Sequence, residues 1–325
     1  MIQSCLEKMW YGSRRFGWLI WPFSLFYQLA SMLQRLYLRT FKQQQFEVPV
    51  IVVGNLSVGG VGKTPLVVAL VNEFQSKGLR VGVVSRGYGA SITSFPHEVS
   101  SADTAVEVGD EPLLLACKLS CPVVIAPKRV EAIRYLLEKF QTEIIISDDG
   151  LQHYRMGRAI EIVVIDGVRG LGNGFCLPAG PLRERPSRLK TADLVVVNGG
   201  HWQEAHTMSI HPGAIQHLAS GHTINAESLE MPVAAVAGIG HPARFFTTLK
   251  EEGIICRQYP FPDHFQYNAS DLCFSEKNVI MTEKDAVKCK SFAADNWYFL
   301  PVEARLAPSF WQALWSNQHL KGYQR

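Results

Sequence analysis

The chain lacks a C-x-x-C pair of cysteines. Its seven cysteines stand at positions 5, 117, 121, 176, 256, 273 and 289. Structural zinc sites and thioredoxin-like redox sites both need such pairs, so neither is expected. Scattered cysteines in odd number are typical of a reducing cytoplasm. The chain also lacks internal repeats and low-complexity tracts, and its 325 residues, 47% of them hydrophobic, suffice for one large or two modest domains.

The chain also has almost no excess of positive over negative side chains, because its net charge is only +3. Residues 1–42 carry six basic side chains and one acidic side chain, so this segment has a net charge of +5 and the other 283 residues sum to −2. A protein that binds nucleic acid along its whole surface would distribute its basic residues more widely. We therefore expect no nucleic-acid partner, and one basic segment with a partner of its own.

The basic segment is also strongly aromatic, with three of the seven tryptophans between residues 10 and 21. Pro22, Gln28 and Ser31 interrupt its apolar run, which argues against a transmembrane helix. No small-residue cleavage site follows the run, which argues against a signal peptide. We predict that residues 1–42 form an amphipathic segment in the interface of a membrane, peripheral or monotopic. The alternative is a core helix packed on the domain that follows.

A glycine-rich loop is the most informative motif. A β-branched run at residues 50–53 leads to G-G-x-G-K-T at residues 59–64, and an apolar segment with helical spacing follows. In such a unit the backbone N–H groups cradle phosphates, Lys63 would reach the β- and γ-phosphates, and Thr64 would hold Mg²⁺. Ser57 stands where the standard motif has its first glycine, and the alternative is a turn that binds nothing. The residues predicted to bind the nucleotide are Ser57, Val58, Gly59, Gly60, Val61, Gly62, Lys63 and Thr64.

The nucleotide is expected to be ATP rather than GTP. Guanine is usually recognised by an Asn/Thr-Lys-x-Asp motif at the end of a strand. Residues 197–200 lack the lysine, and Thr282-Glu283-Lys284-Asp285 places the aspartate directly after the lysine. Neither stretch therefore fits the guanine motif.

Apolar runs alternate with segments of helical periodicity along the chain. Continuous apolar runs predict strands that are buried on both faces, so we predict an α/β fold of the P-loop NTPase type. Its mostly parallel sheet carries helices on both faces and follows the N-terminal amphipathic helix. Residues 200–228 are polar and are interpreted as a linker or an excursion. The predicted units are a P-loop core at 43–228 and a smaller C-terminal α/β domain at 229–325 that contributes to the active-site cleft.

Two aspartates, Asp148 and Asp149, directly follow the apolar run at residues 143–147. Carboxylates at strand ends hold the Mg²⁺ of P-loop enzymes, directly or through water. Asp166, at the end of the next predicted strand, competes for this role. Such an aspartate can also be a turn or helix-cap residue, so the residues alone leave these alternatives open.

Asp110 follows Gly109 at the junction between a loop and a short apolar helix. Taken alone, it could be a helix N-cap. Phosphoryl transfer to an alcohol needs a group that accepts the hydroxyl proton, and Asp110 is the best loop-borne candidate outside the metal strand. His264, in the aromatic loop 261–265, is either an ordinary histidine or part of an ordered active-site loop.

Three arginines are candidates for steadying phosphate charge: Arg129, Arg183 and Arg185. Arg183 and Arg185 belong to a basic loop in an otherwise apolar neighbourhood. For each of the three, a solvated surface arginine is the ordinary alternative.

Several motifs, taken in order, resemble the tetraacyldisaccharide 4'-kinases, which phosphorylate a lipid A precursor. The resemblance runs from the aromatic N-terminus to about residue 302, and no central motif departs from the family pattern. The motifs are residues 54–65, Ser85-Arg86-Gly87-Tyr88-Gly89, Gly109-Asp110-Glu111-Pro112, Asp148-Asp149-Gly150-Leu151-Gln152-His153, residues 177–184, Phe261-Pro262-Asp263-His264-Phe265 and residues 282–288.

This resemblance implies a P-loop kinase that moves the γ-phosphate of ATP, with Mg²⁺, to the 4'-hydroxyl of a tetraacylated glucosamine disaccharide 1-phosphate. It implies a place at the cytoplasmic face of the bacterial inner membrane. The family's base falls on Asp110, with His264 as the residue that orients or tunes it. The other site residues that it implies are Lys63, Arg129 and Arg183 for catalysis, and Thr64, Asp148, Asp149 and Glu111 for the metal.

Two other functions are alternatives. One is a membrane-associated regulatory or chaperone ATPase, although Val58 stands where many such proteins carry an extra lysine. The other is a soluble small-molecule kinase or ligase whose N-terminal helix belongs to the core. The lipid kinase interpretation needs an acylated disaccharide and a membrane surface as partners, and it predicts no obligatory protein partner.

Overall fold

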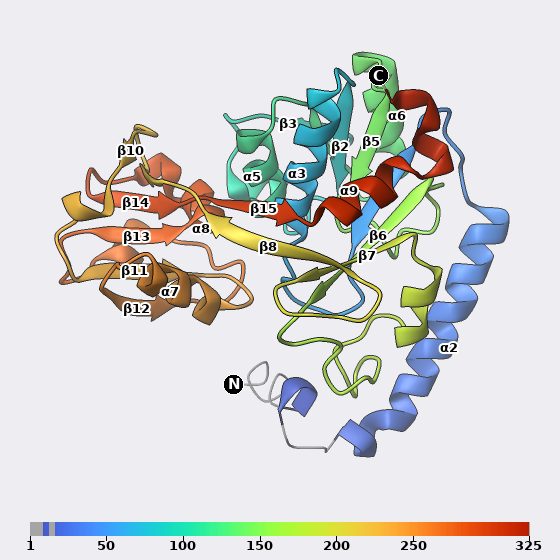
Figure 1. The fold of residues 1–325 in the computed structure, drawn as a ribbon, viewed down its shortest axis with the longest axis horizontal. Coiled ribbons are helices and arrows are strands. Elements are labelled where there is room, and N and C mark those ends of the chain that lie inside the picture. The colour runs from blue at the N-terminus through green and yellow to red at the C-terminus, as the bar shows by residue number, and fades with distance from the viewer. Residues whose placement is uncertain (1–8, 13–16, 325) are drawn as a thin grey trace.

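A computed structural model of the chain describes residues 9–12 and 17–324. Its strands form two sheets, which lie on opposite sides of Figure 1. The larger sheet has nine strands in the order β15-β8-β7-β6-β1-β5-β2-β4-β3. Its strands are β1 (Val50–Gly54), β2 (Val81–Ser85), β3 (His97–Val99), β4 (Val123–Ile125), β5 (Ile144–Ser147), β6 (Ile160–Asp166), β7 (Leu194–Asn198), β8 (His206–Pro212) and β15 (Val302–Leu306).

The larger sheet is parallel except at its two edges, where β3 and β15 pair antiparallel with their neighbours. Successive side chains of a strand alternate between the two faces, and both faces are buried. Ile51 and Val53 belong to the core beneath α3, α5 and α9, whereas Val50 and Val52 belong to the core beneath α6. The predicted mostly parallel sheet with helices on both faces is therefore confirmed. The helices are α3 (Lys63–Ser76), α4 (Ala105–Val108), α5 (Asp110–Lys118), α6 (Arg129–Phe140) and α9 (Pro308–Trp315).

The smaller sheet has six strands in the order β10-β9-β14-β13-β11-β12, and its four neighbouring strands β14, β13, β11 and β12 are parallel. Helix α7 (Pro242–Glu251) buries Phe246 on one face, and α8 (Glu283–Cys289) buries Ala286 on the other. The strands are β9 (Ile215–His217), β10 (Thr223–Ile224), β11 (Val233–Ala237), β12 (Cys256–Pro260), β13 (Val279–Thr282) and β14 (Trp297–Leu300).

The chain crosses between the two units twice. The sequence predicts that the smaller unit spans residues 229–325, and both of these limits are wrong. Residues 200–228 are not a linker, because β8 extends the larger sheet and β9 and β10 belong to the smaller one. The smaller unit does not continue to residue 325, because β15 pairs with β8 and α9 buries Phe310 and Leu314 in the larger core. Figure 1 shows β8 and β15 running together between the units. Strand β8 is polar and partly exposed, so it lacks the apolar pattern that marks a buried strand.

Helix α2 (Gly17–Phe41) runs along the outside of the larger unit (Figure 1). It packs through small residues. Ser24 is buried, donates a hydrogen bond to the Cys176 carbonyl at 2.8 Å and accepts one from the Ala179 N–H at 3.1 Å. A Cβ on Gly17 would lie only 2.7 Å from the Ala179 carbonyl oxygen, so glycine allows the close approach.

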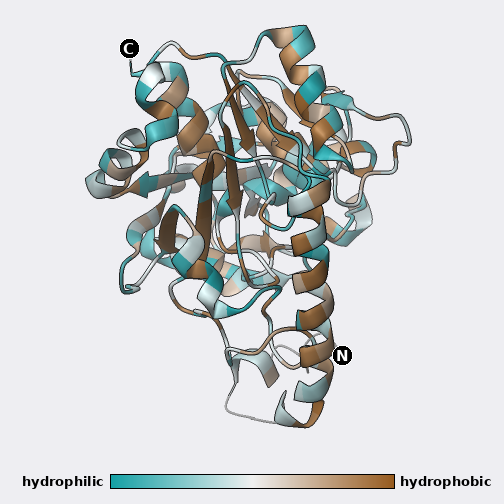
Figure 2. Ribbon diagram, turned by 90° about the vertical axis from the view of Figure 1, so that its right-hand side faces the viewer, coloured by the Kyte–Doolittle hydropathy of each residue, from teal (hydrophilic) through white to brown (hydrophobic). Residues whose placement is uncertain are grey.

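Many of the apolar side chains of α2 are exposed, and Figure 2 shows hydrophobic residues, in brown, along this helix. Trp18, Phe23, Phe26 and Leu36 have exposed fractions of 63–73%, which a helix buried in a core would not show. Within the part of the chain that the structure describes, no helix is both long enough and apolar enough to cross a membrane. The predicted amphipathic segment, residues 1–42, also includes residues 1–8 and 13–16, which lie outside the described residues.

Candidate active site

The predicted site residues lie where the strand ends of the two sheets meet. Loops that follow β1, β2, β4 and β5 of the larger sheet, and β11, β12 and β13 of the smaller sheet, line two cavities. We call the cavity of about 260 Å³ the P-loop cavity, and the cavity of about 670 Å³ the Asp110 cavity. Gly60, Lys63, Glu111 and Asp263 line both, so the cavities adjoin. Open α/β sheets bind ligands outside the carboxyl ends of their strands, and here both sheets supply such ends.

The glycine-rich loop is fixed by Asn55 from the end of β1. Its Nδ2 donates hydrogen bonds to the carbonyls of Ser57 at 2.6 Å and Gly59 at 3.3 Å. Lys63 Nζ donates to Asn55 Oδ1 at 3.2 Å, so the same side chain orients the lysine. Asn55 therefore stabilises the loop and the orientation of Lys63 together.

Two of the eight predicted nucleotide-binding residues face away from the cavities. Ser57 is buried and pairs with Leu182, and the Val58 N–H donates to the Pro181 carbonyl at 2.9 Å. The other six, residues 59–64, line one or both cavities. Ser57, which stands where the standard motif has its first glycine, therefore pairs with the loop at 181–183 and does not face the phosphate site.

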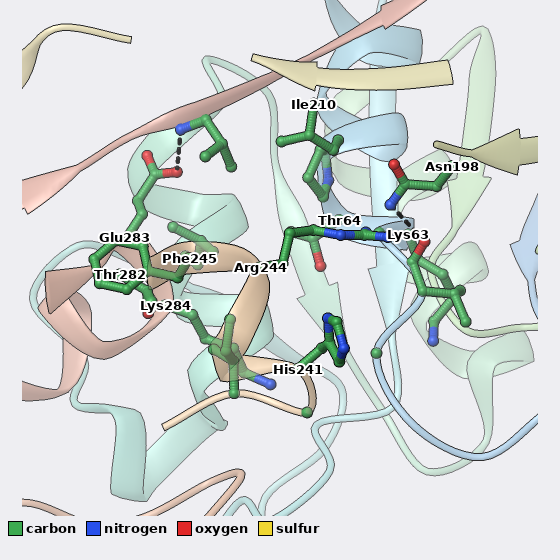
Figure 3. Close-up of a pocket in the computed structure, with 18 of the residues that line it drawn as sticks. Lys63, Thr64, Asn198, Ile210, His241, Arg244, Phe245, Thr282, Glu283 and Lys284 are labelled. Atoms are coloured by element: carbon green, nitrogen blue, oxygen red, sulfur yellow. Dashed lines mark hydrogen bonds between the residues drawn. The ribbon is translucent and has the colours of Figure 1, made fainter. Parts of the chain in front are cut away.

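Gly62 has a φ of 92°, and a Cβ there would lie 2.4 Å from Asn198 Nδ2, so only glycine fits. Asn198 at the end of β7 donates from that nitrogen to the Val61 carbonyl at 3.0 Å. Figure 3 shows the P-loop cavity, with Thr64 and Asn198 on one side and Arg244 reaching toward them from α7. Both units therefore contribute walls to this cavity.

Asp110 and His264 are brought together by the structure. Gly109 occupies the N-cap position of α5 and Asp110 is its first residue, so Asp110 is not the N-cap. His264 Nδ1 lies 2.9 and 3.0 Å from the two carboxylate oxygens of Asp110, which is 5% exposed. Burial acts to raise the pKa of Asp110, but the His264 hydrogen bond and the Lys284 charge outweigh it and lower the pKa to about 2. The same hydrogen bond raises the pKa of His264.

Lys284 is a site residue that is not among the predicted ones. Its Nζ lies 3.0 Å from Glu111 Oε1, 3.2 Å from Asp263 Oδ1 and 3.6 Å from Asp110 Oδ2. Burial opposes its charge, but these carboxylates raise the pKa of Lys284. Lys284 lies in the first turn of α8, two residues after the end of β13. The sequence signal for it is the stretch 282–288, which belongs to the motifs of the family resemblance.

The loop after β12, which carries His264, is anchored by the buried side chain of Asp285. Asp285 Oδ2 accepts hydrogen bonds from the Gly238 N–H at 2.8 Å and the Thr282 hydroxyl at 2.6 Å. Its Oδ1 accepts one from the Tyr267 hydroxyl at 3.1 Å and lies 2.7 Å from Lys288 Nζ. This network ties the loops after β11 and β12 to α8.

Asp148 and Asp149 have different surroundings. Asp148 is 1% exposed, and neither carboxylate oxygen has a hydrogen-bond partner among the described residues. Burial raises the pKa of Asp148, and the charge of Glu111 adds to the effect. Asp149 lies 3.5 Å from Lys63 and 3.3 Å from Arg183, and these cations overcome its burial and lower its pKa to about 2. A buried carboxylate without donors is the arrangement that a bound cation satisfies.

The predicted metal set is not assembled as one cluster. No group of three or more His, Cys, Asp or Glu side chains in the described residues is placed to hold a metal ion. Asp149 turns to Lys63 and Arg183, and Glu111 turns to Lys284. Asp148, which has no hydrogen-bond partner among the described residues, and Thr64, which lines the P-loop cavity, carry oxygen ligands of the kind that Mg²⁺ binds.

Arg129 and Arg183 both line the Asp110 cavity. Arg129 is buried and donates from Nη2 to the Asp149 carbonyl at 2.9 Å. Arg183 donates to the Asp149 carboxylate and, at 3.2 Å, to Gln152. Arg86, which is not among the predicted catalytic residues, lines the same cavity. Cations thus surround one side of the cavity that carries Asp110.

Two other residues considered from the sequence lie outside both cavities. Asp166 Oδ1 accepts hydrogen bonds from the N–H groups of Val168 at 2.9 Å and Arg169 at 3.0 Å, so Asp166 stabilises a turn. Arg185 is exposed and donates from Nε to Gln28 of α2 at 2.5 Å. The carboxylate of Asp166 thus has partners of its own, including Arg244 at 3.4 Å, whereas that of Asp148 has none among the described residues.

Comparisons with known proteins agree with the geometry. The family model for tetraacyldisaccharide-1-P 4'-kinase matches residues 16–319. A tetraacyldisaccharide 4'-kinase of Legionella pneumophila (strain Lens) is 56% identical over 318 residues, which cover 98% of each chain, and one of Hahella chejuensis is 46% identical, with 94% of each covered. The crystal structure of "apo" form LpxK from Aquifex aeolicus in complex with ATP matches with a TM-score of 0.77 and 27% identity, over 95% of this chain and 99% of that one. The chain therefore belongs to the tetraacyldisaccharide-1-P 4'-kinase family.

Proposed function

We propose that this chain transfers the γ-phosphate of ATP, with Mg²⁺, to the 4'-hydroxyl of a tetraacylated glucosamine disaccharide 1-phosphate, a step of lipid A biosynthesis. The observation that supports the proposal most strongly is that Asp110 and His264 share a cavity with Gly60 and Lys63 of the glycine-rich loop. An alcohol bound there would lie between a carboxylate and the loop that cradles the phosphates, which is the arrangement that in-line transfer needs.

Asp110 is the proposed base. Its low pKa keeps the carboxylate ionised at neutral pH, so it can accept the hydroxyl proton as the acceptor oxygen approaches the γ-phosphorus. His264 orients this carboxylate through its Nδ1 hydrogen bond. Lys284 lies near the carboxylates of both Asp110 and Glu111, and its charge adds to the His264 hydrogen bond in keeping Asp110 ionised.

Lys63, Arg129 and Arg183 are proposed to bind the charge on the phosphates during transfer. Lys63 and Arg183 both face the carboxylate of Asp149. A γ-phosphate would offer these two cations a second anionic partner. Mg²⁺, when bound, supplies the charge neutralisation of the β- and γ-phosphates that P-loop enzymes need. Asp148 and Thr64 would hold it.

Replacing Asp148 with asparagine should raise the Mg²⁺ concentration needed for half-maximal activity by about tenfold, because a neutral amide is a weaker cation ligand. Mg²⁺ titrations at saturating ATP measure this. Asp295→Asn is the control, since Asp295 is an exposed aspartate that lines neither cavity. An unchanged Mg²⁺ dependence in Asp148→Asn would remove Asp148 from the metal site.

We also propose that α2 holds the enzyme at the cytoplasmic face of the bacterial inner membrane, as a peripheral or monotopic protein. An acylated acceptor leaves a bilayer only at a cost of about 0.8 kcal/mol per buried CH₂ group, so the enzyme must work at the surface. The exposed apolar side chains of α2 support this, and Tyr27 and Gln34 of the same helix line the Asp110 cavity. The proposal includes no nucleic acid and no obligatory protein partner.

The triple variant Trp18→Gln, Phe23→Gln and Phe26→Gln should weaken binding to lipid vesicles by at least about tenfold, because burying each of these side chains in lipid contributes on the order of 1 kcal/mol or more. Vesicle sedimentation measures the effect. A control variant carries glutamine at Val106, Val168 and Ile255, which are exposed apolar residues away from α2. Equal vesicle binding by the two variants would contradict a membrane role for α2.

Production of ADP with and without acceptor tests the proposed reaction against a regulatory ATPase. A kinase should form ADP only when the acylated disaccharide is present, with one phosphorylated lipid for each ADP. Formation of ADP at the same rate without acceptor would favour the regulatory ATPase instead.

A further inference from the structure

A third cavity, of about 270 Å³, lies between α2 and the segment 183–191. Helix α2 contributes Gln28, Ser31, Met32 and Arg35, whose spacing of i, i+3, i+4 and i+7 places them on one face of the helix. The opposite wall is the end of the basic loop and the 3₁₀ helix η1 (Pro186–Thr191). We call this space the basic cavity.

Four arginines line the basic cavity against one carboxylate, that of Glu184. Arg35 and Arg188 lie 3.4 and 3.5 Å from Glu184, and Arg188 also pairs with Glu161. Arg183 pairs with Asp149 at the border of the Asp110 cavity.

Arg185 differs from the other three arginines. Its Nε is held by Gln28, and no carboxylate of the described residues forms an ion pair with it. A guanidinium held in place by a neutral amide keeps its charge and its outer N–H groups for an anion. The hydroxyls of Ser31 and Ser187 line the same space and can add hydrogen bonds.

The basic cavity continues from the Asp110 cavity. Arg183 lines both. Helix α2 also lines both, with Tyr27 and Gln34 facing the Asp110 cavity and the neighbouring stripe, which includes Ser31, facing the basic cavity. A ligand that lies along α2 and ends at Asp110 would therefore pass Arg183 and reach Arg185.

We propose that the basic cavity binds the phosphate monoester at position 1 of the glycolipid acceptor, with Arg185 as its principal ligand. This inference rests on the proposed function, because it takes the 4'-hydroxyl to lie at Asp110. The 4'-hydroxyl and the 1-phosphate are carried by different sugars of the disaccharide, so the two groups need two sites along one path. The exposed apolar face of α2 also places this site near the surface of a bilayer that retains the acyl chains.

The test compares two acceptors, the tetraacyl disaccharide with and without its 1-phosphate, in micelles of neutral detergent. Arg185→Gln should raise KM for the phosphorylated acceptor by about tenfold with kcat unchanged, which is the effect of losing one charge-assisted hydrogen bond. It should leave KM for the dephosphorylated acceptor unchanged. Ser31→Glu, which places a negative charge in the cavity, should act in the same direction.

Lys190→Gln is the matched control, because it removes one positive charge from an exposed residue of η1 that does not line the cavity. It should change KM for neither acceptor. An equal rise of KM for both acceptors in Arg185→Gln would overturn the inference and assign Arg185 to general attraction of the micelle surface.

A phospholipid headgroup is the other source of the same phosphate chemistry. If it were the ligand, adding phosphatidylglycerol to the micelles would change KM equally for both acceptors in wild type and have no effect in Arg185→Gln. That result would also overturn the inference.

Two further outcomes separate this inference from the proposed function. Wild type that phosphorylates neither acceptor would contradict the proposed function. Transfer to both acceptors, with the same preference between them in the variants as in wild type, would contradict this inference alone.

Discussion

Replacing Lys63 with alanine should lower the rate of phosphate transfer by about 10³-fold or more. Lys63 is the cation that the glycine-rich loop presents to both the P-loop cavity and the Asp110 cavity. Its ammonium, oriented by Asn55 at 3.2 Å, is placed to stabilise charge on the transferring phosphate. Steady-state turnover at saturating ATP and acceptor measures the loss.

Lys77→Ala is the control for Lys63→Ala, because Lys77 lies exposed at the other end of the same helix, α3. It removes one lysine from the same unit and should retain full activity. Full activity of Lys63→Ala would show that the glycine-rich loop does not bind the transferring phosphate, whatever its geometry.

Replacing Asp110 with alanine should lower turnover by about 10²–10⁴-fold, the usual contribution of a general base. Asp110 lies outside the P-loop cavity, so the affinity for ATP should change little. Turnover and equilibrium ATP binding, measured on the same preparation, separate these two effects. Asp295→Ala is the control, since Asp295 is exposed and only its backbone carbonyl is hydrogen-bonded within the part of the chain that the structure describes.

The partnership of Asp110 with His264 can be tested by a double variant. If His264 acts only through Asp110, then Asp110→Ala with His264→Ala should be no slower than Asp110→Ala alone. If the loss of rate in the double variant instead equals the product of the losses in the two single variants, His264 contacts the reacting groups by itself. A loss of ATP binding as the main effect of Asp110→Ala would instead move Asp110 to the metal site.

The larger sheet is predictable because its strands are continuous apolar runs, such as Ile144–Ser147, buried on both faces. The strands that join the two units are not predictable in the same way. His206–Pro212 and Val302–Leu306 pair at an edge of the sheet and are only partly buried, so their side chains carry little periodic signal. The predicted domain boundary therefore fails where the chain crosses between the units.

The individual residues of the candidate site are predictable from the sequence, but the contacts between them are not. Asp110 and His264 are 154 positions apart and belong to different units, so their contact depends on how the two units face each other. Only the family resemblance connects them before the structure is known. The pairing of Glu111 with Lys284 likewise depends on that arrangement, and it explains why the predicted metal carboxylates do not form one cluster.

The most direct test of the proposed reaction is the transfer of radiolabelled γ-phosphate from ATP to a tetraacyl disaccharide 1-phosphate in mixed micelles, with wild type and Asp110→Ala side by side. We expect label in the lipid with wild type, and a loss of about 10²–10⁴-fold with the variant. Label released only as free phosphate, at the same rate in both proteins, would contradict both the lipid kinase reaction and the role of Asp110.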